Sequence, residues 1–342
     1  MKMNTDMDIK MNIREQIKRI APYTVVEGPY TIWLDKNENP FDIPLPIKEE
    51  LCEELKRIPF NRYPSVMADS LREKIAHTLQ VEKENIVLSS GADELISCVL
   101  KLLEGETVII SSPTFGMYRV FAALEGLPLL DVPLDKNFRL QKVENFAENV
   151  RAIFVCSPNN PTGNIQEREK IIHILDTGAP VILDEAYIEF AKESCIDLVW
   201  EYDNLVILRT FSKACGLAGV RVGYAVAQKE VCTYVKRIQC PFNLNILSAK
   251  AAEIMLDHYE VVEQNIEFVI KERGRIKREF RQAFPSEANF LLIDANAYEF
   301  FLRKGIVVKQ LGGSLKGMIR VTVGRKEEND QFISALKEFL EE

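Results

Sequence analysis

The sequence predicts an α/β protein: a mostly parallel sheet with helices on both faces, followed by a smaller α/β unit. Three observations support this prediction. Between residues 85 and 227, short uninterrupted apolar runs recur, as expected of strands that are buried on both faces. Segments with apolar residues at helical spacing separate several of these runs. After Pro241 the pattern changes to a long helical stretch and a shorter set of strand-like runs.

The elements can be predicted in chain order. The first forty residues are irregular and end in a polar turn closed by Pro40. Amphipathic helices are expected over about 46–57 and 68–79. Buried strands are expected at 85–89, 107–111, 152–156, 181–183, 205–208 and 222–227, with helices at 94–103 and 167–175. A helical stretch over about 246–281 and strands near 290–293 and 318–323 complete the expected set.

These patterns divide the chain into three parts. Its 342 residues are enough for two domains and a sizeable core. We expect an N-terminal arm over residues 1–40, a large domain over residues 41–245 and a small domain over residues 246–342. The arm is expected to help build the small domain.

Composition and charge argue against several classes of protein. The chain has a net charge of −8 and no long basic run, which argues against nucleic-acid binding. No apolar stretch approaches the roughly 20 residues that span a bilayer, and the polar, acidic start does not read as a signal peptide. Seven scattered cysteines without a Cys-x-x-Cys pair favour reduced thiols in the cytoplasm, and three isolated histidines indicate no metal site.

Polar clusters follow four of the predicted strands, and ligands bind beyond the carboxyl ends of the strands in an open parallel sheet. The first cluster, residues 89–94, begins a helix, where free backbone N–H groups favour a phosphate. Simple capping of that helix by Ser90 or Asp93 is the alternative. The second cluster, residues 156–163, holds Asn160 in a rigid turn with two prolines and a glycine; a turn without a ligand is the alternative.

The third cluster, residues 181–187, places Asp184 directly after a buried apolar strand. A carboxylate is costly there unless it is paired, and a protonated ring nitrogen would be such a partner. An apolar strand followed by Asp-Glu also resembles a Walker B segment of nucleotide-binding proteins, but the chain lacks the matching phosphate loop.

The fourth cluster, residues 210–223, contains Lys213, Ser212 and Arg221. An amine that can form a Schiff base, beside donors suited to a phosphate, is what pyridoxal 5′-phosphate requires. The glycines of this segment do not have the Gly-x-Gly-x-x-Gly spacing of dinucleotide sites.

Several of these segments resemble the fold-type-I aminotransferases. They are Ser-Pro-Asn-Asn-Pro-Thr-Gly at 157–163, Asp-Glu-Ala-Tyr at 184–187, and the lysine segment at 210–223. Four more sharpen the resemblance to the histidinol-phosphate aminotransferases: Asp-Lys-Asn-Glu-Asn-Pro at 35–40, Asn-Arg-Tyr-Pro at 61–64, Ser-Gly-Ala-Asp-Glu-Leu at 90–95 and Arg-Val-Thr-Val-Gly at 320–324. The matches run from about residue 20 to 325 in family order. The resemblance implies the pyridoxal-phosphate-dependent transferase fold type I, with a smaller α/β C-terminal domain.

The resemblance also implies a role for each residue around the cofactor ring. Lys213 would form the Schiff base and shuttle the proton, and Asp184 would hold the pyridine nitrogen protonated. Tyr187 and Asn160 would hydrogen-bond the phenolic oxygen O3′. Phe115 falls where a ring stacks on the pyridine, a contact that needs only the aromatic face.

The cofactor phosphate would be bound by a second group of residues. Ala92 and Asp93 would offer backbone N–H groups, and Ser212 and Arg221 would complete the cup. Tyr63 would reach the phosphate from the partner subunit, so that a homodimer would share its active sites.

On the substrate side, Arg320 would clamp a carboxylate and Tyr23 would close over the distal end. Lys309 stands where many relatives carry an arginine that contacts the substrate phosphate. A lysine supplies the charge but not the planar fork of the guanidinium, and a solvated surface lysine is the alternative.

The implied reaction transfers an amino group between the small molecules L-histidinol phosphate and 2-oxoglutarate, a step of histidine biosynthesis. An aromatic or broad-specificity aminotransferase and a threonine-phosphate decarboxylase would use the same core residues and remain alternatives. A non-catalytic sensor with this fold usually has an added DNA-binding module, for which the chain has neither spare length nor a basic face.

Overall fold

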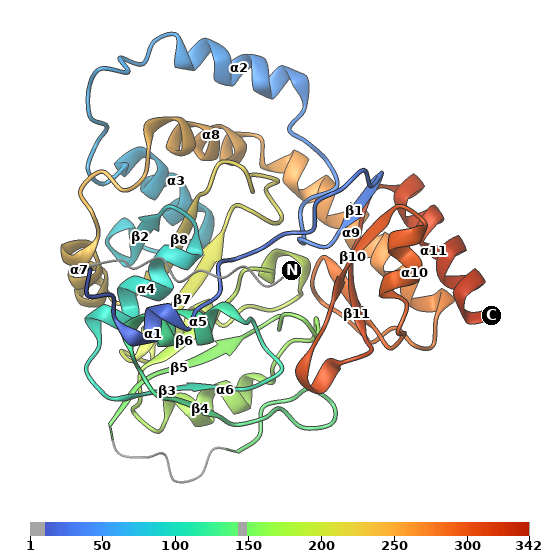
Figure 1. Ribbon diagram of the computed structural model, residues 1–342. Helices are drawn as coiled ribbons and strands as arrows, with labels where there is room; N and C mark the ends of the chain where they lie inside the picture. Colours follow the sequence, from blue (N-terminus) through green and yellow to red (C-terminus); the bar gives the residue numbers. More distant parts are fainter. Residues whose placement is uncertain (1–10, 143–148, 342) are drawn as a thin grey trace.

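The computed structural model of the protein describes residues 11–142 and 149–341. The larger of its two sheets has seven strands within this part of the chain, in the order β2-β8-β7-β6-β5-β3-β4 (Figure 1). The strands are β2 (Ile86–Ser89), β3 (Thr107–Ile110), β4 (Leu129–Asp131), β5 (Val150–Cys156), β6 (Val181–Asp184), β7 (Leu205–Thr210) and β8 (Gly223–Ala227). Six of these strands run in one direction and β8 alone runs in the opposite one, so the prediction of a mostly parallel sheet is confirmed.

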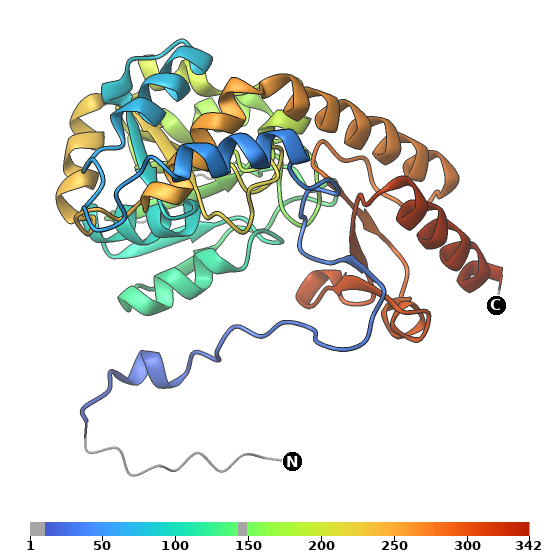
Figure 2. The ribbon, with the colours of Figure 1, turned by 90° about the horizontal axis from the view of Figure 1, so that it is seen from above.

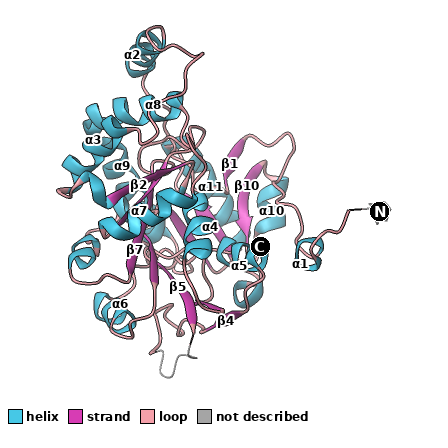
Figure 3. Ribbon diagram, turned by 90° about the vertical axis from the view of Figure 1, so that its left-hand side faces the viewer, coloured by secondary structure: helices cyan, strands magenta, loops and turns pink. Residues whose placement is uncertain are grey.

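Both faces of this sheet are covered by helices, which explains the uninterrupted apolar runs. In β5, Ile153 and Val155 pack into one core, whereas Phe154 packs into the other. The first core includes α3 (Asp69–Leu79), α6 (Arg168–Leu175) and α8 (Ile246–Asp257); the second includes α4 (Ala92–Leu102), α5 (Met117–Glu125) and α7 (Lys229–Ile238). Figure 3 shows α6 and α4 on opposite sides of the strands.

The smaller sheet combines the N-terminal segment with the C-terminal part of the chain. Its order is β1-β10-β11-β9, from β1 (Ile32–Leu34), β10 (Ile306–Gln310), β11 (Ile319–Thr322) and β9 (Phe290–Ile293). β1 pairs in parallel with β10, although the two strands are far apart in sequence. The helices α9 (Tyr259–Glu279), α10 (Tyr298–Arg303) and α11 (Lys326–Glu341) pack against this sheet (Figure 1).

Two regions differ from the sequence-based expectation or extend it. The helical stretch expected over 246–281 is two helices, α8 and α9, because His258 between them leaves the helical conformation (φ −112°, ψ 41°). Ahead of β1 the chain runs along the surface to α1 (Glu15–Lys18), where Arg14 donates a hydrogen bond to the carbonyl of Leu124 (Figure 2). The remaining elements are α2 (Leu45–Leu55) and the 3₁₀ turns Lys83–Asn85, Ile188–Phe190, Ile196–Trp200 and Gly313–Leu315.

None of the helices in residues 11–142 and 149–341 combines the length and apolar character that a membrane-spanning segment needs.

Candidate active site

A cavity of about 130 Å³ lies at the carboxyl ends of β5, β6 and β7, beside the first turn of α4. The strand register explains how distant segments meet there, because Cys156 pairs with Asp184 and Asp184 with Leu208, which brings the strand ends level. Of the residues predicted to contact the cofactor, all except Tyr63 lie in the cavity wall: Ala92, Asp93, Phe115, Asn160, Asp184, Tyr187, Ser212, Lys213 and Arg221.

Lys213 follows the end of β7, and its side chain forms part of this cavity wall. Its Nζ donates a hydrogen bond to the carbonyl of Lys36 at 3.1 Å and lies 5.7 Å from the centre of the Tyr187 ring. Burial lowers the pKa of Lys213 to about 8, and the charges of Arg320 and Arg221 act in the same direction. With that pKa, about a tenth of the amine is neutral at pH 7, compared with far less for an ordinary lysine. The side chain is therefore prepared to act as a nucleophile and as a base.

Asp184 ends β6 as a buried carboxylate held by two hydrogen bonds. The hydroxyl of Tyr118 donates to Oδ2 at 2.6 Å, and the backbone N–H of Ala186 donates to Oδ1 at 3.0 Å. Burial raises the pKa of Asp184 to about 6, and the opposing contributions come from these hydrogen bonds rather than from a cation. A cationic ring nitrogen would supply the missing partner.

The contact of Tyr118 with Asp184 was not predicted from the sequence. Tyr118 lies in α5, where it is fully buried and stacks on Phe154 with ring centres 4.6 Å apart. The available signal was a tyrosine among the apolar residues of a segment with helical spacing, since a buried phenol needs a hydrogen-bond partner.

The N-terminus of α4 forms a cradle of hydrogen-bond donors. Gly91 stands at the N-cap position and no side chain caps the helix, so the alternative of capping by Ser90 or Asp93 is wrong. Arg221 reaches over this turn: its Nη1 donates to Ser212 Oγ at 3.4 Å, and a Cβ on Gly91 would lie 2.5 Å from its Nη2. Backbone N–H groups, a hydroxyl and a guanidinium thus converge where the chain leaves room, and this donor set fits a phosphate group.

A second set of polar contacts joins Tyr187 to the small sheet. Arg320, in β11, donates from Nη1 to Asn160 Oδ1 at 2.6 Å, while its Nε is buried without a partner among the described residues. Asn160 Nδ2 lies 3.4 Å from the Tyr187 hydroxyl, and Asn37 Nδ2 donates to the same oxygen at 2.9 Å. No contact of Asn37 was predicted from the sequence, although the residue lies within segment 35–40, which resembles the aminotransferase family.

The residues predicted for the substrate line a larger adjoining cavity of about 630 Å³. Tyr23, Lys309 and Arg320 all lie in its wall, together with Lys36. Tyr23 and Lys309 are exposed side chains, whereas Arg320 is buried. The two cavities share four wall residues, Phe115, Asn160, Tyr187 and Lys213, so Lys213 faces both.

Tyr63 is the predicted residue that the single chain does not bring to the site. Its side chain is 81% exposed and stacks on Phe242 with ring centres 4.5 Å apart. It lies outside the wall of both cavities.

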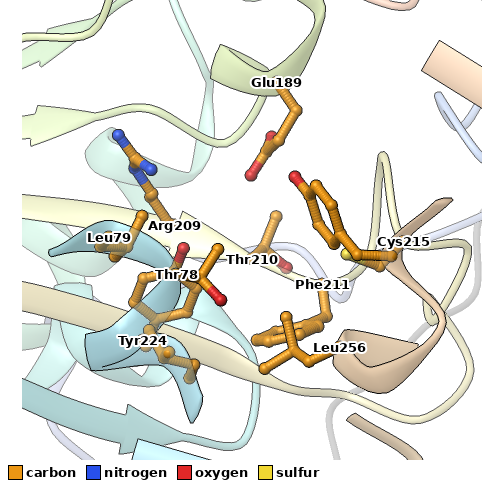
Figure 4. A pocket seen from close by; sticks show the side chains of 11 residues that line it. Thr78, Leu79, Glu189, Arg209, Thr210, Phe211, Cys215, Tyr224 and Leu256 are labelled. Carbon is orange, nitrogen blue, oxygen red and sulfur yellow. The ribbon is translucent and has the colours of Figure 1, made fainter. Parts of the chain in front are cut away.

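Behind the lysine segment lies a third cavity of about 50 Å³ (Figure 4). Thr210 belongs to the walls of both this cavity and the one that holds Lys213. Arg209 lines it too, and its guanidinium is held in a buried ion pair with Glu185 at 2.7 Å. Across the cavity, Oε2 of Glu189 is enclosed without a hydrogen-bond partner among the described residues, and burial raises the pKa of this carboxyl to about 7.

Comparison with known proteins identifies the family of this chain. Residues 30–336 match the family described as aminotransferase class I and II. A histidinol-phosphate aminotransferase of Pyrococcus furiosus is 52% identical over 333 residues, which cover 96% of this chain and 98% of the relative. The crystal structure of the histidinol-phosphate aminotransferase from Clostridium acetobutylicum has a TM-score of 0.80 at 26% identity, covering 90% of this chain and 98% of that one. The enzyme of that name from Sinorhizobium meliloti, solved in complex with pyridoxal 5′-phosphate, has a TM-score of 0.85 at 21% identity over 98% and 99% of the two chains, a likeness of fold.

The α/β sheet with helices on both faces and the similarity to aminotransferase structures place the protein among the pyridoxal-phosphate-dependent transferases of fold type I. Within that class, the chain belongs to the class I and II aminotransferase family.

Proposed function

We propose that this protein transfers an amino group between L-histidinol phosphate and 2-oxoglutarate, with pyridoxal 5′-phosphate as cofactor. The observation that carries the proposal is the pair of joined cavities: Lys213 faces both, one contains a phosphate cradle, and the other has cationic walls for an anionic substrate. The 52% identity to a named histidinol-phosphate aminotransferase supports the choice of substrate.

The cofactor phosphate would be held by the N–H groups of Ala92 and Asp93, the Ser212 hydroxyl and the Arg221 guanidinium. The ring would lie against Phe115, which shares the cavity wall with these residues. When bound, pyridoxal phosphate withdraws electrons from the substrate carbon that exchanges its proton.

Lys213 would hold the cofactor through Nζ and afterwards move the proton at the substrate carbon. Its lowered pKa serves both tasks, because the neutral amine is the form that attacks a carbonyl and the form that accepts a proton. Asp184 would keep the pyridine nitrogen protonated, and the Tyr187 hydroxyl with the Asn160 amide would contact O3′.

Arg320 and Lys309 would bind the acidic ends of the substrates. Arg320 Nε has no hydrogen-bond partner within the described part of the chain, and Lys309 lies on β10, whose register with β11 pairs it directly with Arg320. The phosphate of one substrate and a carboxylate of the other would use these cations in turn, with Tyr23 closing over the distal end. Lys309 would attract the phosphate as a point charge, without the bidentate geometry of an arginine.

A homodimer with shared sites would complete this arrangement. The proposal is supported by the exposed position of Tyr63, which lies outside the walls of the two joined cavities. An exposed side chain is available to contact the phosphate cradle of a partner subunit. We also propose that the chain is divided into an arm (1–40), a large domain (41–245) and a small domain (246–342). Residues 1–10 of the arm lie outside the described residues. A cytoplasmic location fits the scattered cysteines, which are all free in the described residues.

Two alternatives use the same cofactor residues. An aromatic or broad-specificity aminotransferase would need only Arg320 for a carboxylate, and a threonine-phosphate decarboxylase would also use a phosphate-binding cation. Both would leave the joined cavities unchanged, so substrate turnover must separate them.

The test is turnover of L-histidinol phosphate with 2-oxoglutarate by the purified holoprotein. We expect kcat/KM there to exceed that for phenylalanine at least about tenfold, because phenylalanine lacks the phosphate and with it one charged contact. We also expect it to exceed kcat/KM for the decarboxylation of phosphothreonine. Preference for either of the other substrates would refute the specific proposal while leaving the family assignment intact. Lys213→Ala should lack the borohydride-sensitive visible absorption of the wild-type holoprotein.

A further inference from the structure

We propose that Asn37 is a positioning residue that holds the Tyr187 hydroxyl as a hydrogen-bond donor toward the cofactor and ties it to the small sheet through Thr322. This inference rests on the proposed contact between Tyr187 and O3′. It concerns a side chain of the N-terminal segment, to which neither the sequence motifs nor the cofactor cavity gives a role.

The amide orientation of Asn37 follows from its two partners. Thr322 Oγ1 donates to Asn37 Oδ1 at 3.3 Å, and the backbone N–H of Asn37 donates to Thr322 Oγ1 at 3.0 Å. The oxygen of the amide therefore faces Thr322, and the NH₂ group faces Tyr187 at 2.9 Å. Asn37 lies in the wall of the larger cavity but is only 1% exposed, so these bonds are largely shielded from water.

The Tyr187 oxygen receives two N–H donors, from Asn37 at 2.9 Å and from Asn160 at 3.4 Å. A phenolic oxygen offers two acceptor positions and one proton. With both acceptor positions occupied, the remaining proton of Tyr187 is directed away from these amides and into the cavity that it lines. Donation of that proton to a phenolate oxygen stabilises the anion and lowers the pKa of the neighbouring imine nitrogen.

The backbone conformation at Asn37 also favours an asparagine at this position. Its φ of 55° lies in the left-handed region, which asparagine tolerates better than most side chains. Asn289 Nδ2 donates to the backbone carbonyl of Asn37 at 3.0 Å, which fixes the turn from the other side. The turn is therefore held by Asn289 and Thr322, and only the Asn37 side chain passes from it to Tyr187.

The charged groups that face Tyr187 are Arg320, Asp184 and Lys213, and none of them needs to be altered in the test. Burial raises the pKa of the Tyr187 phenol, while Arg320 and the hydrogen bond from Asn37 oppose that rise. Loss of the Asn37 amide thus removes a partner of the phenol without changing any nearby charge.

The experiment measures the pH midpoint of the visible absorption of the holoprotein, which requires no substrate. Asn37→Gly removes the side chain and keeps the left-handed backbone accessible. We expect its midpoint to rise by about 0.5 to 1 pH unit, as the loss of one ordinary hydrogen bond would produce. Asn37→Asp replaces the donor with an acceptor and also adds a negative charge, so it should shift the midpoint at least as far in the same direction.

Two further variants separate this inference from its foundations. Tyr187→Phe should raise the midpoint most; no shift there would refute the contact between Tyr187 and the cofactor, and with it the inference. Asn289→Ala loosens the same turn but keeps the Asn37 amide and its hydrogen bonds with Thr322, so it should lower the melting temperature and move the midpoint less than Asn37→Gly does. If Asn37→Gly leaves the midpoint unchanged while Tyr187→Phe moves it, or if Asn289→Ala moves it equally, Asn37 has no positioning role.

Discussion

The hydroxyl of Tyr118 donates a hydrogen bond to Oδ2 of Asp184 over 2.6 Å, inside the core that covers one face of the sheet. This bond fixes the carboxylate that faces the cavity and favours its ionised form. Because burial raises the pKa of Asp184 to about 6, the charge of this carboxylate at neutral pH depends on such donors.

Tyr118→Phe is therefore expected to weaken pyridoxal phosphate binding. Loss of the donor raises the pKa of Asp184 further above its usual value, so more of the carboxyl is protonated near neutral pH and cannot pair with a protonated ring. A hydrogen bond to a charged group is worth about 1.5–3 kcal/mol, which corresponds to about a tenfold or greater rise in the dissociation constant. The effect should be larger at pH 6 than at pH 8, measured by equilibrium dialysis of the apoprotein with the cofactor.

The phenyl ring left by this substitution keeps its stacking on Phe154, so the fold should survive. Tyr202→Phe is the matched control, because the Tyr202 hydroxyl donates to Asp176 at 2.8 Å near the surface, away from the cavity. Equal cofactor affinity in the two variants would show that the Tyr118 bond does not hold the carboxylate in its active state.

The pKa of Lys213 predicts how fast the apoprotein captures its cofactor. Burial and the nearby arginines lower this pKa from 10.5 to about 8, and the neutral amine is the nucleophile. The rate constant for capture should therefore rise with pH and level off above about 8, as followed by the growth of visible absorption. Arg320→Leu removes a charge that lowers the pKa, so its midpoint should move to higher pH. A wild-type rate that still climbs beyond pH 10 would contradict the burial of this amine.

Glu189→Gln should change the pH dependence of stability. Burial raises the pKa of Glu189 in the folded protein to about 7, from the ordinary glutamate value of 4.5. Between these values the unfolded chain releases a proton that the folded protein retains, so stability falls as pH rises from about 4.5 to 7, by on the order of 2–3 kcal/mol. Glutamine carries no charge, and the variant should lose this part of the decline between pH 5 and pH 8 in urea titrations.

The exposed Glu193 provides the control for that measurement. Glu193→Gln makes the same substitution at an exposed position just after the 3₁₀ turn that carries Glu189, and should leave the wild-type pH dependence intact. A parallel decline in wild type and Glu189→Gln would mean that the carboxylate beside the third cavity is solvated when ionised.

The sequence was sufficient to predict those site residues that lie in short contiguous segments directly after a strand. Each cluster that follows a strand is contiguous, and the carboxyl ends of parallel strands share one edge, so Asn160, Asp184 and Lys213 could be expected to meet. The contact between Tyr118 and Asp184 could not be foreseen, since it spans 66 positions and depends on how α5 lies on the sheet. The role of Asn37 likewise depends on the pairing of β1 with β10, which brings an N-terminal turn against Tyr187.

Gly91→Ala tests the phosphate cradle, and Gly178→Ala is its matched control. Both glycines have a positive φ, 82° and 77°, so alanine strains the backbone at each, by about 1 kcal/mol or more. The strain is expected to be larger at Gly91, because its ψ of 156° places it in a region that is almost exclusive to glycine. A Cβ at position 178 meets nothing within 4 Å, whereas a Cβ at position 91 would lie 2.5 Å from Nη2 of Arg221 and push the guanidinium aside.

Both alanine variants should therefore lose stability, but only Gly91→Ala should lose phosphate binding. Displacing Arg221 removes a charge-assisted contact, which predicts at least about a tenfold weaker affinity for pyridoxal phosphate in Gly91→Ala alone. Pyridoxal without its phosphate should bind both variants as it binds wild type, because it does not use the cradle. If pyridoxal binding falls as steeply as pyridoxal phosphate binding in Gly91→Ala, the added methyl group disturbs the site of the ring. The prediction that Gly91 makes room for Arg221 at the phosphate would then be wrong.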